Sequence, residues 1–143
     1  MSNPALRFYR MVSLAMAAIF AAVGLVFLFL PDQALGFFNR LSAPLGLPPA
    51  PLHSAGFYPI LAAAYMYLVT WLAACMFKKP SHPVFPQLLT QGKLASSLFS
   101  LIYFFYRAPY LVCLANAVAD GFVAALVLRL YFLQKKYRAT WST

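Results

Sequence analysis

Acidic residues are almost absent from this chain of 143 residues. Asp32 and Asp120 are its only carboxylate side chains, against 11 lysines and arginines, and the formal net charge is +9. A soluble domain averages about 25% charged residues, whereas this chain has 9% and is 64% hydrophobic. So little charge leaves too little polar surface for a water-soluble fold, and it predicts an integral membrane protein.

Clusters of metal-binding or catalytic side chains are also missing from the sequence. His53 and His82 fall in separate loops, and Cys75 and Cys113 fall in separate apolar segments, so we expect neither pair to share a metal ion or a disulfide. No glycine-rich phosphate-binding motif and no Ser-His-Asp set is present. We predict no metal site and no catalytic residue, and the sequence identifies no cofactor. Without a basic soluble module, the positive charge does not predict nucleic-acid binding.

Long apolar segments are what the chain does have. Four of them approach the roughly 20 residues needed to cross a bilayer. They predict an all-α fold, a bundle of four transmembrane helices in one membrane domain spanning residues 1–143, with helices at about 11–30, 57–77, 88–106 and 109–133. The first run is longer than the roughly 7–15 residues of a signal-peptide core, and Pro31-Asp32-Gln33 does not resemble a cleavage site. We therefore expect an uncleaved anchor.

A proline-rich loop, Pro31 to Gly56, separates the first two apolar segments. Asp32 to Leu41 has an apolar side and is expected to form a short helix in the membrane interface, with Asp32 as its cap. Ala43 to Pro51 is expected to be extended. Two interpretations of this stretch stay open: a lid or docking surface, and a stiff connector along the headgroups.

The positions of the basic residues predict the orientation of the bundle. Eight of them fall on one side of the predicted spans, namely Arg7, Arg10, Lys78, Lys79, Arg129, Lys135, Lys136 and Arg138, whereas Arg40 and Arg107 fall on the other. Basic residues favour the cytoplasmic side of a membrane. Both termini are therefore predicted to be cytoplasmic and the proline-rich loop external, as in a bacterial inner membrane protein.

Lys93 and Asp120 are the two charged residues that lie deep inside apolar segments. If the last two segments form a hairpin that turns at Arg107, residue i faces residue 215 minus i, and the two charges lie within ~3 Å of the same depth. An isolated charge there costs from ~2.5 to more than 10 kcal/mol. This cost predicts an ion pair between them, supported by Asn116 and by serines on the facing helix.

Three roles for this pair are compatible with the sequence. It can lock the register of the hairpin, or Lys93 can extend toward the cytoplasmic interface and leave Asp120 protonated or hydrogen-bonded. Alternatively, the pair lines a polar cavity that binds a lipid headgroup, a quinone or a proton. The residues predicted to form a ligand site in that case are Lys93, Asp120, Asn116, Tyr65 and Ser97.

Two short stretches carry a family resemblance. Val23-Gly24-Leu25-Val26-Phe27-Leu28-Phe29-Leu30-Pro31 ends the first segment before a Gly/Pro loop, and Ala119-Asp120-Gly121 lies in the last one. In this plan the chain resembles DoxX-like small four-helix membrane proteins. The resemblance implies the four-helix architecture over most of the chain, and we transfer no enzymatic role from it.

Two functional hypotheses follow from these observations. The first is a non-catalytic accessory or scaffold subunit that packs against a membrane-protein partner or another copy of itself, because almost no mass lies outside the predicted spans. The alternative is a four-helix bundle that binds or converts a lipid or quinone at a polar site formed by Lys93 and Asp120. Both place the protein in contact with a lipid bilayer.

Overall fold

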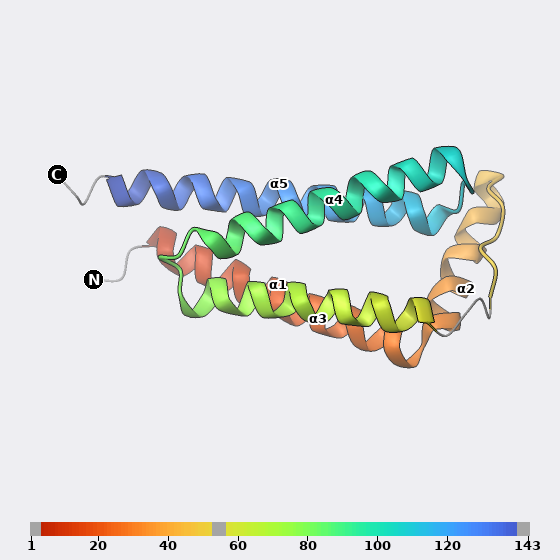
Figure 1. Cartoon of the computed structure of the whole chain (residues 1–143), viewed down its shortest axis with the longest axis horizontal. Coiled ribbons are helices and arrows are strands. Elements are labelled where there is room, and N and C mark those ends of the chain that lie inside the picture. The colour runs from red at the N-terminus through yellow and green to blue at the C-terminus, as the bar shows by residue number, and fades with distance from the viewer. Residues whose placement is uncertain (1–3, 53–56, 140–143) are drawn as a thin grey trace.

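The computed structural model describes residues 4–52 and 57–139, and helices account for nearly all of them (Figure 1). Those ranges contain no strand. The elements in chain order are α1 (Pro4–Phe29), α2 (Pro31–Ser42), a 3₁₀ turn η1 (Ala43–Leu45), α3 (Phe57–Lys78), α4 (Val84–Tyr106) and α5 (Leu111–Ala139). The predicted all-α fold is confirmed.

The long helices are arranged as two pairs (Figure 1). Helix α1 packs along α3, and α4 packs along α5. The pairs approach each other at the end where α1 begins and α5 ends, and they separate toward the opposite end, where α2 lies across the gap. We call these ends the closed half and the open half of the bundle.

Among the described residues, three helices are long and apolar enough to cross a membrane: Pro4–Phe29, Tyr58–Lys78 and Leu111–Lys135. They correspond to the first, second and fourth predicted spans, which confirms the prediction of an integral membrane protein at this level. The third predicted span falls in α4, which is 23 residues long but less apolar because it carries Lys93 and several hydroxyl groups. Its crossing of the membrane stays a prediction.

The helices extend beyond the apolar runs that predicted them. Helix α1 already begins at Pro4 and α4 at Val84, since proline is tolerated in the first turn of a helix. Helix α5 begins at Leu111 instead of 109, because a tight turn joins the Tyr110 amide to the Ala108 carbonyl over 2.8 Å. Hydropathy therefore located the apolar part of each helix and not its ends.

The short helix predicted at Asp32 to Leu41 is present as α2, but its predicted cap is wrong. Leu30 occupies the N-cap position and makes no side-chain capping bond, Pro31 opens the helix, and Asp32 lies within its first turn. The physical reason is that the fixed φ of proline and its missing N–H suit the first helical position. Asp32 still favours the helix there through the helix dipole.

The loop after α2 is folded back on this helix and is not simply extended. It starts with η1 and turns at Gly46, whose φ of 65° is in the left-handed region. The Asn39 side chain then holds Ala50 at both backbone atoms: its Nδ2 donates to the Ala50 carbonyl over 2.8 Å, and its Oδ1 accepts from the Ala50 amide over 2.7 Å. His53 lies outside the described residues.

The hydrophobic core lies in the closed half. Its buried side chains come from the first part of α1, the last part of α3, the start of α4 and the end of α5. They are Tyr9, Met16, Ala17, Phe20, Met66, Val69, Ala73, Met76, Leu89, Val127 and Leu130. The core therefore joins the two helix pairs at one end only.

Small residues allow α1 and α3 to pack closely along their length. Ser13, Ala17 and Gly24 lie on one side of α1 and are buried, whereas Ala21 is exposed. A Cβ atom on Gly24 would lie 2.9 Å from the Cβ of Met66, which is closer than such atoms approach in proteins. Glycine at this position is therefore a packing requirement of the α1–α3 pair.

Candidate functional site

Lys93 and Asp120 form an ion pair between α4 and α5. Lys93 Nζ lies 2.7 Å from Asp120 Oδ1, and the two side chains are 1% and 6% exposed. This confirms the predicted pair. It also contradicts the interpretation in which Lys93 extends to the membrane surface, because the lysine is fully buried and directed to the carboxylate.

Three further hydrogen bonds fix the register of the α4–α5 hairpin. Ser97 Oγ donates to the Ala117 carbonyl over 2.7 Å. Asn116 Nδ2 donates to Ser100 Oγ over 2.8 Å and to Ser96 Oγ over 3.2 Å. Each of these contacts joins positions within about three residues of the antiparallel register expected for a turn at Arg107. Asn116 and the serines of α4 therefore bond across the hairpin beside the ion pair.

Two aromatic rings hold the Lys93 ammonium from the other helix pair. Its Nζ lies 4.8 Å from the ring centre of Phe20 on α1 and 5.0 Å from that of Tyr65 on α3. The Tyr65 hydroxyl donates to the Gly92 carbonyl of α4 over 3.1 Å. A cation over an aromatic face is stabilised by the negative potential of the ring. The ion pair therefore ties both helix pairs together at the border of the closed half.

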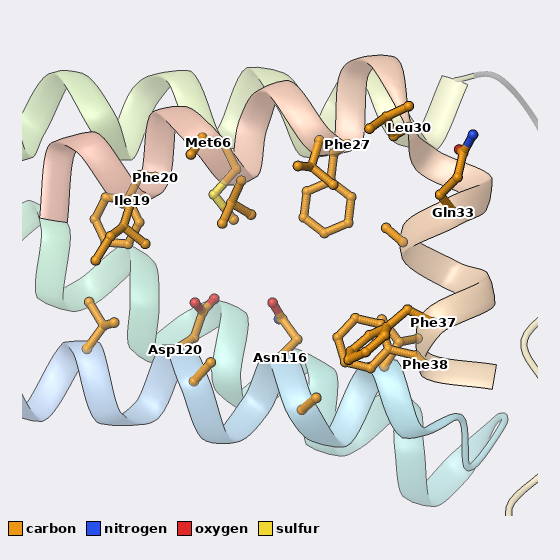
Figure 2. Close-up of a pocket in the computed structure, with 18 of the residues that line it drawn as sticks. Ile19, Phe20, Phe27, Leu30, Gln33, Phe37, Phe38, Met66, Asn116 and Asp120 are labelled. Carbon is orange, nitrogen blue, oxygen red and sulfur yellow. The ribbon is translucent and has the colours of Figure 1, made fainter. Parts of the chain in front are cut away.

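A cavity of about 720 Å³ lies in the open half, between α1, α2 and α5 (Figure 2). Most of its lining is apolar, and the largest share comes from α1 and α5. The lining residues are Ile19, Phe20, Ala22, Val23, Val26, Phe27, Leu30, Gln33, Ala34, Phe37, Phe38, Met66, Lys93, Val112, Ala115, Asn116, Ala119, Asp120 and Val123. Helix α2 closes its end.

The polar groups of the cavity are concentrated on its α5 side. Figure 2 shows the carboxylate of Asp120 and the side chain of Asn116 projecting from α5 toward α1. The second carboxylate oxygen, Asp120 Oδ2, is buried and has no hydrogen-bond partner among the described residues. Such a group costs free energy unless a partner satisfies it. It is the feature of the cavity that most directly indicates a bound molecule.

The five predicted site residues do not share one role. Lys93, Asn116 and Asp120 line the cavity. Tyr65 and Ser97 are not part of its lining: Tyr65 supports Lys93 from α3, and Ser97 bonds the backbone of α5. The structure therefore places these two residues behind the cavity wall.

The apolar wall opposite the ion pair was not identified from the sequence. Phe20 and Phe27 are seven residues apart and therefore share one face of α1, and Phe37 and Phe38 come from α2. The spacing on α1 was a usable signal. The sequence had placed α2 in the membrane interface, and no local pattern distinguishes a helix in that position from one that packs against α1 and α5.

The arrangement is suited to binding. Within residues 4–52 and 57–139, no group of three or more His, Cys, Asp or Glu side chains comes together, and Cys75 and Cys113 are free thiols. What the cavity offers is apolar surface and one polar corner, which matches a molecule with a small polar end. Comparison of the chain with protein-family models, curated proteins and solved structures finds no match. The function is therefore argued from the geometry of the site.

Proposed function

We propose that this protein binds a small, mostly apolar molecule within the membrane, in the cavity of its open half. The observation that carries this proposal is the cavity itself: about 720 Å³, with apolar walls and its polar groups gathered at Asn116 and Asp120. Ligand pockets typically measure about 300–1,000 Å³ and combine apolar walls with a few polar groups that orient the ligand.

The ligand reaches the cavity from the lipid. Ile19 and Val26 line it from α1, and they are 59% and 41% exposed. Exposed lining residues on a membrane-spanning helix face the hydrocarbon of the bilayer, so the cavity opens laterally. This favours an occupant that partitions into membranes, and it agrees with the lipid or quinone named among the hypotheses above.

We infer that all four long helices cross the membrane with both termini in the cytoplasm. At about 1.5 Å per residue a helix of 23 residues exceeds the ~30 Å hydrocarbon core, and α4 has that length, with its one intramembrane charge paired. The start of α1 and the ends of α3 and α5 lie at the closed end (Figure 1), and these segments carry Arg7, Arg10, Lys78 and Lys135. Helix α2 and the turn after α4, which carry Arg40 and Arg107, lie at the other end. This distribution suits the cytoplasmic membrane of a bacterium.

We also propose that the chain is related to DoxX-like membrane proteins. The support is the four-helix plan with a Gly/Pro-containing loop after the first helix. Because Asp120 of the Ala119-Asp120-Gly121 stretch contributes to the ion pair, the resemblance includes a residue of the proposed site.

Native mass spectrometry tests the binding proposal. The tagged chain is extracted under gentle conditions, together with Ala22→Phe, which adds an aromatic ring to the cavity wall on α1, and Ala21→Phe as matched control. Both alanines are exposed on α1, but only Ala22 lines the cavity. We expect wild type and Ala21→Phe to retain a non-protein mass that Ala22→Phe loses. Equal small-molecule content in all three proteins would refute binding in this cavity.

The accessory-subunit hypothesis is the second candidate, and one observation favours it. Tyr67 lies near the middle of α3 and is 70% exposed, with Trp71 one turn further and 57% exposed. A tyrosine hydroxyl in hydrocarbon gains from a partner that accepts its hydrogen bond, and a helix of another protein would supply one. Co-purification of a stoichiometric partner that Tyr67→Phe weakens would support it, and a monomer without partners would contradict it.

A further inference from the structure

The polar corner of the cavity presents acceptors, and this limits what the ligand can be. We infer that the occupant carries a neutral hydrogen-bond donor, a hydroxyl group on an apolar body, and places it against Asp120 Oδ2 and Asn116. The inference rests on the proposed function and specifies the chemistry of its ligand.

Lys93, the one cation at the site, already has binding partners within the protein. Lys93 Nζ donates to Asp120 Oδ1 over 2.7 Å, and the rings of Phe20 and Tyr65 cover it at 4.8 and 5.0 Å. These three contacts come from α5, α1 and α3, so they approach the ammonium from different elements. Lys93 therefore supports the carboxylate and is poorly placed to donate to a ligand.

The acceptor oxygens of Asp120 and Asn116, in contrast, are not all used in hydrogen bonds within the protein. Asp120 is 4% exposed, and its Oδ2 has no partner among the described residues, although its Oδ1 is paired. Asn116 uses its Nδ2 for Ser96 and Ser100 on α4, so its carbonyl oxygen is the group left for the cavity. Both side chains project from α5 toward α1 (Figure 2). The corner therefore accepts hydrogen bonds.

Charge balance determines the kind of donor. Lys93 and Asp120 neutralise each other, so a ligand cation would leave one uncompensated positive charge in hydrocarbon, and a ligand anion would meet a carboxylate. A carbonyl, ester or ether has only acceptor oxygens, which would face Asp120 Oδ2 without a proton between them. A hydroxyl supplies that proton and adds no charge, and a hydrogen bond to a charged acceptor is among the stronger ones.

The inference is tested with pairs of probe molecules in which one member has a hydroxyl group and the other has a methyl ether in its place. Purified full-length protein in lipid nanodiscs is titrated with 4-nonylphenol and with its methyl ether, which share the apolar body. We expect the phenol to bind about tenfold or more tightly. Hexadecanol and its methyl ether form a second pair, and the pair with the larger preference distinguishes a ring alcohol from a chain alcohol as the natural source of the hydroxyl.

Variants test whether the preference for the phenol over its ether comes from the polar corner formed by Asp120 and Asn116. In the double variant Lys93→Met/Asp120→Leu both charges are replaced by apolar groups, which buried ion pairs often tolerate. We expect it to bind phenol and ether equally, with affinity for the ether unchanged. Ala22→Phe should bind neither probe, whereas Ala21→Phe should behave as wild type.

The wild-type titration alone can overturn the inference, whether or not the double variant folds. Equal affinity for phenol and ether, or preference for the ether, would refute the donor inference and leave the binding proposal intact. If neither member of either pair binds wild type, both the inference and the cavity as a binding site fail. A preference that persists in the double variant would place the accepting group elsewhere and would also contradict the inference.

Discussion

The two halves of the bundle are built from the same four long helices, yet only one is packed. In the closed half, Val69, Ala73, Met76, Leu89 and Val127 are at most 1% exposed. In the open half, residues of α1 and α5 face each other across a cavity of about 720 Å³. The difference shows that this fold does not need contact between its helix pairs along their whole length.

The border between the halves is the Lys93–Asp120 pair. On its closed side lies the apolar core, and on its open side lie Asn116 and the cavity. Because Lys93 also contacts Phe20 and Tyr65, the pair links all four long helices at that level. Lys93 therefore packs against the other helix pair, and Asp120 faces the cavity.

Removing one partner of the Lys93–Asp120 pair should have the largest effect on the free energy of unfolding. Asp120→Leu leaves Lys93 charged and unpaired in the interior of the bundle, and removing one partner of a buried pair costs roughly 3–5 kcal/mol. Lys93→Met/Asp120→Leu should recover most of this loss, because neither charge remains. Unfolding titrations in mixed micelles measure both changes. If the double variant is as unstable as the single one, the pair does not act as a unit.

A substitution at Gly24 tests whether α1 and α3 stay packed alongside the cavity. Gly24→Ala places a Cβ against Met66, with 2.9 Å between the two Cβ atoms, and overpacking typically costs about 1–3 kcal/mol. Gly36→Ala in α2 is the control, because a Cβ there meets nothing within 4 Å. It should be neutral or stabilising by up to about 1 kcal/mol. Equal effects in the same unfolding titration would contradict the close approach.

Matched valine truncations compare the halves directly. Val127 is 0% exposed in the core, whereas Val26 lines the cavity and is 41% exposed. Val127→Ala should cost about 1–2 kcal/mol through lost packing, and Val26→Ala should cost less than about 0.5 kcal/mol. Thermal melting of the two variants side by side checks the ratio. A larger loss for Val26→Ala would mean that the open half is packed in the membrane.

The smallest expected effect is confined to α2 and the loop that follows it. Asn39→Ala removes both hydrogen bonds to Ala50, each with a net value of about 0.5–1.5 kcal/mol. Hydrogen exchange at residues 43–52 should accelerate, while protection of the closed half should not change. Exchange that is unaffected in this loop would show that other contacts hold it.

The sequence predicted the Lys93–Asp120 ion pair, but it did not predict the cavity beside it. Lys93 and Asp120 stand out because charge inside an apolar segment is costly, and the hairpin register then follows from helix geometry. The cavity has a much weaker signal: apart from the spacing of Phe20 and Phe27 on α1, lining residues such as Ala22 and Val112 have the pattern of ordinary lipid-facing or packing residues. Whether two apolar faces touch or separate depends on the angle between helix pairs, which is a tertiary property.

The sequence also allowed two possible starts for α2. Asp32 is a favourable capping residue, and Pro31 is a favourable first helical residue, so the choice between them was not determined locally.

A spin-label distance measurement tests the asymmetry most directly. Two label pairs join α1 to α5 at exposed positions, Leu25 with Val118 in the open half and Leu14 with Leu128 in the closed half, in a background where Cys75 and Cys113 are replaced. We predict that 4-nonylphenol narrows and shifts the Leu25–Val118 distance distribution and leaves the Leu14–Leu128 distribution unchanged. Two narrow distributions that the phenol does not affect would contradict an open half that takes up a ligand.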